Sequence, residues 1–158
     1  MELENNCPRK NLSRAVQLAV LSMSVAPTIA LADVQLDEGG GAAGSALTTI
    51  TNTGTIAPAA DYLNVDGANT QLTGGVTNNG SITAGGDAFD VRAASTISGA
   101  ITNESGGTIT AGDDAFDVDT RSTISGAITN SGTITAGDDA FDVDDRSTIS
   151  GAITNSGT

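Results

Sequence analysis

Aspartate residues recur at fixed intervals in the second half of the chain, and they are the side chains with the clearest capacity for chemistry. When the sequence is divided into its repeats, six of them form two aligned series: Asp87, Asp114 and Asp139, and Asp90, Asp117 and Asp142. Carboxylate oxygens are ligands that Ca²⁺ prefers in proteins. Like charges stacked about 4.8 Å apart also repel by about 1 kcal/mol per pair even in water, and a hard cation would relieve that repulsion. The six residues are therefore a predicted Ca²⁺ column, and a solvated acidic face is the simpler interpretation.

Part of a known calcium-binding pattern lies within this series. Gly112–Phe116 (GDDAF) matches half of the nonapeptide found in calcium β-rolls. The leading glycine pair of that pattern is missing, however, and the repeat is 25 residues long. We expect Arg121 to reach Asp144 or Asp145 of the next repeat and to relieve part of the charge. Ca²⁺ binding is accordingly an alternative function, and no other cofactor is expected.

The same aspartates do not form a pattern typical of an enzyme. Paired carboxylates can cleave glycosidic bonds, but the two groups need different environments that separate their pKa values. Here the acids repeat identically from one unit to the next. The chain has no histidine, its single cysteine is Cys7 near the N-terminus, and it contains no G-x-S-x-G motif. We therefore expect no catalytic residues and no enzymatic activity.

Threonines form a second repeated polar pattern. They occupy alternate positions of a short T-x-T phrase that recurs in successive units, at Ser81 and Thr83, Thr108 and Thr110, and Thr133 and Thr135. A flat ladder of this kind on a β-solenoid is typical of ice-binding surfaces, although threonine also suits exposed strand positions in general. Ice binding is a minor alternative function.

A 25-residue repeat positions all of these side chains. Residues 108–132 and 133–157 differ only at Thr120 and Asp145. An earlier unit contains two extra residues, and the unit before it is degenerate. The predicted units are 50–54 (partial), 55–80, 81–107, 108–132 and 133–157.

Each unit contains three short runs in which apolar and polar residues alternate, as expected for strands with one buried face. In Ala115–Asp119, for example, Phe116 and Val118 share a face and the aspartates share the other. The segments Gly-Asp-Asp, Arg-Ser and Asn-Ser-Gly separate the runs as turns. Three strands per unit predict one coil of an all-β parallel β-helix, or solenoid. A β-sandwich of short strands is the rival architecture, but it gives no reason for so close a repeat.

Stacking of coils in register predicts ladders of identical side chains. The predicted aromatic ladder contains Phe89, Phe116 and Phe141. The predicted amide ladder contains Asn78, Asn103, Asn130 and Asn155, which would bond from coil to coil as stacked asparagines do in cross-β structure.

The N-terminal segment is typical of a secretory signal peptide. A basic stretch precedes the apolar residues Ala15–Ala26, and Ala30–Ala32 forms a small-x-small cleavage site. The apolar stretch is too short to span a bilayer. We therefore assign residues 1–32 as a signal peptide and 33–49 as an N-terminal leader or cap region, so that the mature chain begins at Asp33.

The charge of the chain limits its partners. It contains 19 acidic and 6 basic residues, a net charge of −13, and loss of the signal peptide makes the remainder one unit more negative. Such a chain repels nucleic acid and anionic lipid, so neither is an expected partner.

The phrases SGAITNSGTITAG and GDDAFDV, together with the leader, resemble the passenger regions of bacterial autotransporters. The resemblance covers residues 50–158 and the leader. It implies a right-handed β-helix, export through the Sec pathway, a cell-surface or extracellular location, and a structural or adhesive role toward ligands on host or neighbouring cells. Autotransporters end in an outer-membrane barrel, which these residues do not include. We therefore expect a truncated piece of a longer protein, which would remain periplasmic on its own and would meet the outer membrane only through a barrel domain.

Overall fold

The structure, a computed structural model, describes residues 34–37, 46–68 and 70–158. The predicted signal peptide at residues 1–32 and much of the predicted leader region lie outside them. Every regular element in the described residues is a β-strand, and none of these residues belongs to a helix that could cross a membrane.

The strands form three parallel sheets. The first, called here the aspartate sheet, contains β1 (Val34–Asp37), β4 (Leu63–Asp66), β7 (Phe89–Arg92), β11 (Phe116–Val118) and β15 (Asp142–Val143) in that spatial order. The second, the threonine sheet, contains β3 (Thr55–Ile56), β6 (Ser81–Thr83), β10 (Thr108–Thr110) and β14 (Thr133–Thr135).

The third sheet, the long sheet, begins with the two longest strands, β2 (Ala46–Asn52) and β5 (Gln71–Asn78), which pair with each other. In each later coil two short strands replace the single long one. These pairs are β8 (Thr96–Ile97) and β9 (Ile101–Asn103), β12 (Thr123–Ile124) and β13 (Ile128–Asn130), and β16 (Thr148–Ile149) and β17 (Ile153–Asn155).

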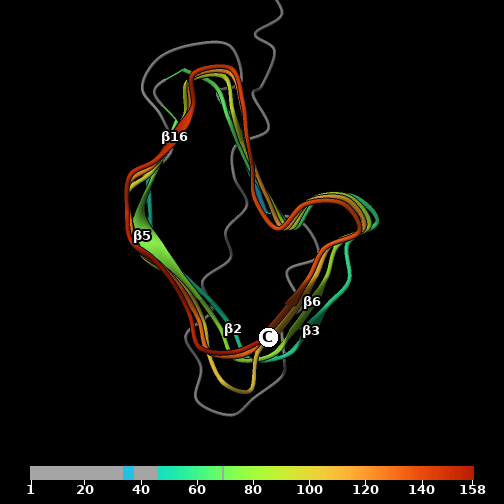
Figure 1. The fold of residues 1–158 in the computed structure, drawn as a ribbon. Helices are drawn as coiled ribbons and strands as arrows, with labels where there is room; N and C mark the ends of the chain where they lie inside the picture. Colours follow the sequence, from blue (N-terminus) through green and yellow to red (C-terminus); the bar gives the residue numbers. More distant parts are fainter. Residues whose placement is uncertain (1–33, 38–45, 69) are drawn as a thin grey trace, which may run out of the picture.

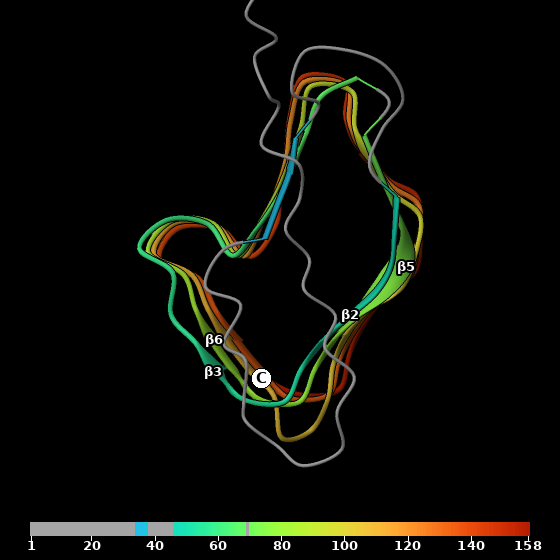
Figure 2. The ribbon, with the colours of Figure 1, turned by 180° about the vertical axis from the view of Figure 1, so that it is seen from behind.

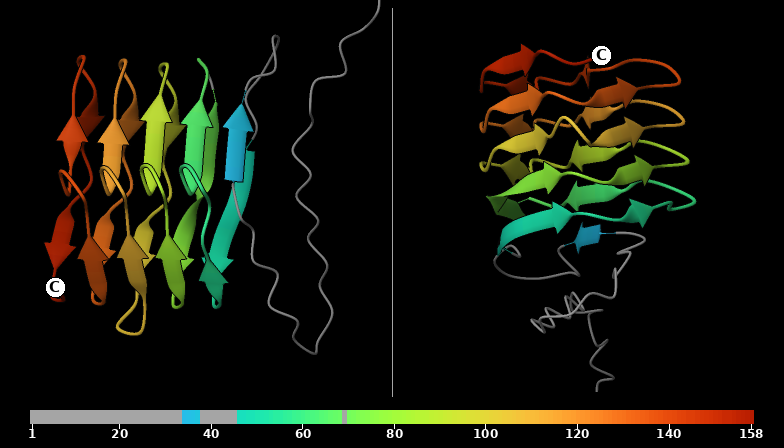
Figure 3. Two further views of the ribbon diagram at one scale, coloured as in Figure 1. Left: turned by 90° about the vertical axis from the view of Figure 1, so that its right-hand side faces the viewer. Right: turned by 90° about the horizontal axis from the view of Figure 1, so that it is seen from below.

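Each strand pairs in parallel with its equivalent one coil further along the chain. The paired residues are 25 to 27 positions apart from β2 onward, as in Asp117 with Asp142 and Phe89 with Phe116, and 29 apart between β1 and β4. Figure 3 shows the coils stacked as successive rungs, with equivalent strands aligned along the molecule. The predicted all-β parallel solenoid is therefore confirmed.

The solenoid is right-handed. In Figure 1 the C-terminal end faces the viewer, and the chain runs from β5 on the left, along the lower edge, to β6 on the right. The chain thus turns counterclockwise as it approaches the viewer. Figure 2 shows the same outline from the N-terminal side, with every coil following nearly the same path.

Aromatic and branched apolar side chains fill the interior. The rings of Phe89 and Phe116 stack with centroids 4.7 Å apart, and those of Phe116 and Phe141 with centroids 4.9 Å apart, so the predicted aromatic ladder is confirmed. Columns of isoleucine lie on the inner side of the other two sheets, where Ile109 pairs with Ile134 and Ile128 with Ile153. At the last coil the core opens, and Ile153 is half exposed.

The amide ladder is also present, and it is one residue longer than predicted. The Nδ2 atom of each asparagine donates to the Oδ1 atom of the next, from Asn52 through Asn78, Asn103 and Asn130 to Asn155, at 2.8 Å in every step. The first four of these side chains are buried. Because each of these four buried amides both donates and accepts, the column satisfies its own buried polar atoms within the solenoid.

Candidate site: the carboxylate array

Two columns of acidic side chains lie along the aspartate sheet and the loop before it. The loop column contains Asp61, Asp87, Asp114 and Asp139, which follow the strands of the threonine sheet. The strand column contains Asp90 on β7, Asp117 on β11 and Asp142 on β15, paired in register. These seven aspartates are called the carboxylate array below. All six predicted site residues belong to it, and Asp61 is an addition.

The loop column is held together by hydrogen bonds from the backbone. The amide nitrogen of each aspartate donates to the Oδ1 atom of the aspartate one coil earlier. The N···O distances are 3.0 Å from Asp87 to Asp61, 2.9 Å from Asp114 to Asp87 and 2.7 Å from Asp139 to Asp114. These carboxylates therefore tie one coil to the next, which gives the repeated acid at this position a structural reason.

The first aspartate of the strand column, Asp90, is more buried than any member of the loop column. Asp90 is only 1% exposed, and its Oδ2 atom accepts a hydrogen bond of 2.9 Å from Nδ2 of Asn64, the residue that pairs with it on β4. Its Oδ1 atom is buried and has no hydrogen-bond partner among the described residues. Asp117 and Asp142, further along the column, are partly exposed.

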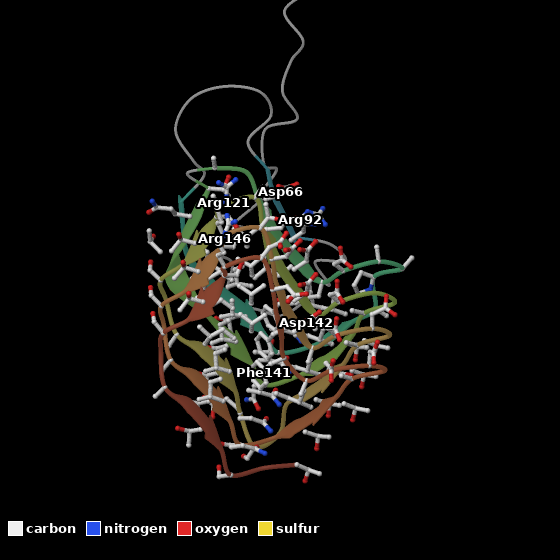
Figure 4. The ribbon with its side chains drawn as sticks, turned by 45° about the horizontal axis from the view of Figure 1, so that its top comes forward. Asp66, Arg92, Arg121, Phe141, Asp142 and Arg146 are labelled. Atoms are coloured by element: carbon white, nitrogen blue, oxygen red, sulfur yellow. The ribbon has the colours of Figure 1, made fainter. Side chains whose placement is uncertain are left out.

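Arg92 supplies the cation of this region, which the sequence prediction missed. Its guanidinium contacts Oδ2 of Asp90 and lies 3.3 Å from Oδ2 of Asp66. Figure 4 shows Arg92 beside Asp66 at the N-terminal end of the array. The sequence alignment of the repeats could have indicated this role, because Arg92 occupies the position of Asp119 and Asp144 in the later units.

The ion pair predicted for Arg121 does not form. The ion pairs within the described part of the chain are those of Arg92, and the guanidinium of Arg121 reaches neither Asp144 nor Asp145. Its backbone nitrogen instead donates to the carbonyl oxygen of Asp145 at 3.1 Å. Arg121 and its neighbour Thr120 have φ values of 64° and 53°, a left-handed turn that places Arg121 and Arg146 at the end of the coil (Figure 4). The conformation of this turn therefore sets the position of the Arg121 Cα atom. The predicted ion pair with Asp144 or Asp145 was wrong.

Burial and repulsion from neighbouring carboxylates raise the pKa values of Asp90 and Asp117. Burial raises the pKa of Asp90 to about 7, the charge of Arg92 opposes this, and the nearby carboxylates of Asp61, Asp117 and Asp87 add to it. Burial also raises the pKa of Asp117 to about 6, with further repulsion from Asp87, Asp119, Asp142 and Asp114. The two columns thus face each other closely enough for their charges to interact.

The array does not by itself resemble a metal centre. No group of three or more carboxylate, cysteine or histidine side chains within the described residues is arranged to hold a metal ion. The register of Asp87, Asp114 and Asp139 and of Asp90, Asp117 and Asp142 is as predicted. Ca²⁺ binding by these six residues stays a prediction.

The other two sheets lack charge altogether. No strand of the threonine sheet or the long sheet contains an acidic or basic residue. The T-x-T phrases are in register along the threonine sheet, where Thr108 pairs with Thr133 and with Ser81. Ice binding by this surface stays a prediction.

The fold and the array together define a class: a right-handed parallel β-solenoid of nearly identical coils, with acidic columns on one face and uncharged strands on the other two. Comparison of the chain with models of known protein families, with curated proteins and with solved structures gives no match.

Proposed function

We propose that this chain is a non-enzymatic structural or adhesive passenger segment of an autotransporter-like protein, exported through the Sec pathway to the cell surface or the medium. In this role the solenoid acts as a rigid stalk that displays its sheets to ligands on host or neighbouring cells. The resemblance of the repeat phrases and the leader to autotransporter passengers supports the proposal, and the β-solenoid fold is consistent with it.

The observation that carries the structural role is the continuity of the ladders. The amide column runs unbroken from Asn52 to Asn155, and the phenylalanine stack runs from Phe89 to Phe141. The members of each of these two ladders have the same kind of partner from coil to coil, whereas a catalytic pair needs two groups in different environments. Each coil of this stack is hydrogen-bonded to its neighbours in all three sheets, which supports the role of a rigid stalk.

The distribution of charge supports a surface role. Within residues 46–68 and 70–158 the acidic side chains lie on the aspartate sheet, in its loops and in a turn after β9. The strands of the long sheet are therefore neutral, and many of their residues have small polar side chains. A strongly negative net charge keeps such a molecule soluble and repels nucleic acid and anionic membranes. The neutral long sheet leaves a surface to which another molecule can bind without charge repulsion.

Export is tested by expressing the full chain in a Gram-negative bacterium and sequencing the N-terminus of the protein in each cell fraction. The expected product outside the cytoplasm begins at Asp33. Ala32→Asp, which removes the small residue at the cleavage site, should accumulate the uncleaved precursor, whereas Ala43→Asp, beyond the site, should be processed normally. An uncleaved cytoplasmic chain would contradict the proposed export. Protease added to intact cells of the source organism then tests surface display.

The alternative proposal is a Ca²⁺-binding surface module. The in-register carboxylates of the array and the unpartnered Oδ1 atom of Asp90 favour it. It is tested at pH 8, above the raised pKa values of Asp90 and Asp117, by calorimetric titration of the mature chain with CaCl₂ and by melting curves with CaCl₂ or MgCl₂. Heat of binding and a higher melting temperature with Ca²⁺ alone are expected. Absence of both would remove this function.

Ice binding is the minor alternative, and the in-register threonine sheet is its support. The purified protein should then show thermal hysteresis, and Thr108→Lys at the centre of the sheet should abolish it. A wild-type protein without thermal hysteresis would rule this function out.

A further inference from the structure

The strand column of the array contains one amide among its carboxylates. Asn64, Asp90, Asp117 and Asp142 pair in register on four successive strands. Asn64 donates from Nδ2 to Oδ2 of Asp90 at 2.9 Å. An amide can both donate and accept, whereas an ionised carboxylate can only accept. The first rung of this column is therefore satisfied, and the rungs that follow have no side-chain donor of their own.

The asparagine ladder on the long sheet shows what a satisfied column requires. There, every rung donates to the next at 2.8 Å, and the buried polar atoms are paired throughout. A protonated carboxyl group has nearly the shape of the asparagine amide and carries one O–H donor. A column of aspartates can therefore form the same kind of ladder only where protons are bound to it.

Such a donor is missing at Oδ1 of Asp90 and at the side chain of Asp117. Asp90 is 1% exposed and its Oδ1 atom is buried without a partner, which is a costly arrangement for an ionised oxygen. No donor within the described residues forms a hydrogen bond to the side chain of Asp117, which is only partly exposed. Both residues therefore lie where a proton would supply the missing donor.

The charged groups around these residues are mostly acidic. Asp90 is faced by Asp61 and Asp87 from the loop column, by Asp117 from β11 and by Arg92 from its own strand. Arg92 is the one cation among them, and it contacts the Oδ2 atom, which Asn64 already pairs. The groups facing Asp117 are all acidic, namely Asp87, Asp114, Asp119 and Asp142.

We propose that the strand column, at Asp90 and Asp117, takes up protons when the chain folds and shares them between neighbouring carboxyl groups, so that mild acid stabilises the solenoid. Neighbouring carboxylates that cannot all ionise commonly share a proton in this way. The proton gives Asp90 or Asp117 the donor that Asn64 has permanently. The proposal concerns the stability of the folded chain in any solution, so it does not depend on the proposed surface function.

The direction of the pH dependence follows from the raised pKa values. In the unfolded chain an aspartate has a pKa of about 3.9, whereas in the solenoid the pKa of Asp90 is about 7 and that of Asp117 about 6. The folded state therefore binds more protons than the unfolded state between about pH 4 and pH 7. Stability from these groups is complete below about pH 4 and is lost as the pH rises through 6 and 7.

The test is the melting temperature of the full chain, followed by circular dichroism from pH 8 to pH 5 at constant ionic strength with EDTA present. The wild type should melt about 5 °C or more higher at pH 5 than at pH 8. Asp117→Asn supplies the donor permanently, so it should melt higher than the wild type at pH 8 and change less with pH. Asp145→Asn is the matched control, because it removes the same charge from an exposed turn outside the array, and it should keep the wild-type pH dependence.

A melting temperature that is flat or falls from pH 8 to pH 5 would overturn the proposal, as would equal flattening by Asp117→Asn and Asp145→Asn. A variant Asp117→Asn that is less stable than the wild type at pH 8 would overturn it too, since the ionised carboxylate would then be the favoured form. Independently of any variant, unfolding of the wild type at pH 6 in buffers of different ionisation enthalpy should show net proton release. Unfolding without proton release would contradict the shared protons directly.

Discussion

Side chains at equivalent positions of successive coils form columns that stabilise this solenoid. The central members of each column have more partners than the terminal ones. Asn103 accepts from Asn78 and donates to Asn130, and it also bonds the carbonyl oxygens of Gly107 and Thr133. A buried amide with this many partners cannot be removed without leaving neighbouring polar atoms unpaired.

Asn103→Ala should therefore lower the free energy of unfolding by about 2 kcal/mol or more, because it breaks the ladder on both sides. Nδ2 of Asn78 then keeps only its bond to Thr108 O, and Oδ1 of Asn130 keeps only its bond from Gly132 N. The matched control is Asn79→Ala in the exposed turn after the same column, where the change should stay within about 0.5 kcal/mol. Urea titrations followed by circular dichroism measure both. Equal effects of the two substitutions would show that the ladder contributes little.

The phenylalanine stack permits a similar comparison. Phe116 is fully buried and stacks on rings at both sides, whereas Phe141 stacks on one ring and is partly exposed. Phe116→Leu should cost about 1–3 kcal/mol, from two lost ring contacts of about 0.5–1.5 kcal/mol each. Phe141→Leu should cost about half as much. Chemical denaturation gives both values, and a larger loss at Phe141 would contradict the assignment of Phe116 as the centre of the stack.

These registers could be predicted from the sequence because a 25-residue offset aligns identical residues. The side chains that break the repeat could not. Tyr62 lies one residue before Leu63, which pairs with Phe89, so it takes the place of Ala88 and packs edge-on to Phe89 with centroids 5.9 Å apart. Burial raises the pKa of Tyr62 to about 12. Asn64 and Arg92 likewise acquire their roles only through the partners that folding gives them.

At the scale of the strands, the sequence pattern predicted three runs per coil, but it did not predict the division of the third. In the later coils the Ser-Gly-Ala segment separates two short strands, such as β12 and β13, whereas β5 is continuous. Gly99, Gly126 and Gly151 stack there so closely that a Cβ atom on Gly126 would lie 1.9 Å from the carbonyl oxygen of Gly99. Such a close approach depends on the backbone path, which alternation of residue types does not record.

Gly126→Ala should consequently be among the most damaging small substitutions, at about 3 kcal/mol, because neither coil can move without disturbing its own pairing. Ala127→Ser at the exposed neighbouring position is the control and should change the free energy of unfolding by less than about 0.5 kcal/mol. Thermal and urea unfolding of the two variants decide the matter. A Gly126→Ala protein as stable as the wild type would mean that the coils separate there at little cost.

The turns at the end of the aspartate sheet show a second limit of sequence reasoning. The sequence predicted a turn at Arg121-Ser122, and the structure places Thr120 and Arg121 in the left-handed region with φ of 53° and 64°. Ala93 and Ala94 have the same conformation one coil earlier. Glycine or asparagine is the usual sign of such a backbone. Here the coil-to-coil hydrogen bond from Ala94 N to Thr120 O, at 2.9 Å, helps to hold the turn instead.

For the molecule as a whole, the solenoid behaves as a one-dimensional stack. Each coil contacts only the coils before and after it, so its stability is close to the sum of coil terms and interface terms. The fold class and the ladders could be predicted from the repeat for this reason, whereas the right-handed sense was implied only by the resemblance of the repeat phrases. The facing of the two acidic columns could not, because it depends on how the loop after the threonine sheet turns back beside the aspartate sheet.

Removal of one complete coil is the strongest test of this picture. Deletion of residues 108–132 joins Gly107 to Thr133, which reproduces the Gly-Thr junction that already precedes each of these units. Each ladder should then re-form across the deletion. Phe89 should stack on Phe141, Asn103 should pair with Asn155 and Asp90 with Asp142, in the register that their strands now have with the deleted coil. The shortened protein should fold, unfold cooperatively at a lower urea concentration, and show an m-value smaller by about a quarter, because unfolding exposes one coil fewer.

Deletion of residues 108–120 alone, about half a coil, is the control. It should abolish cooperative unfolding, because it places polar turn residues where strands must pair. If the half-coil deletion were as stable as the full-coil deletion, the in-register stacking of whole repeats would not be what specifies the fold.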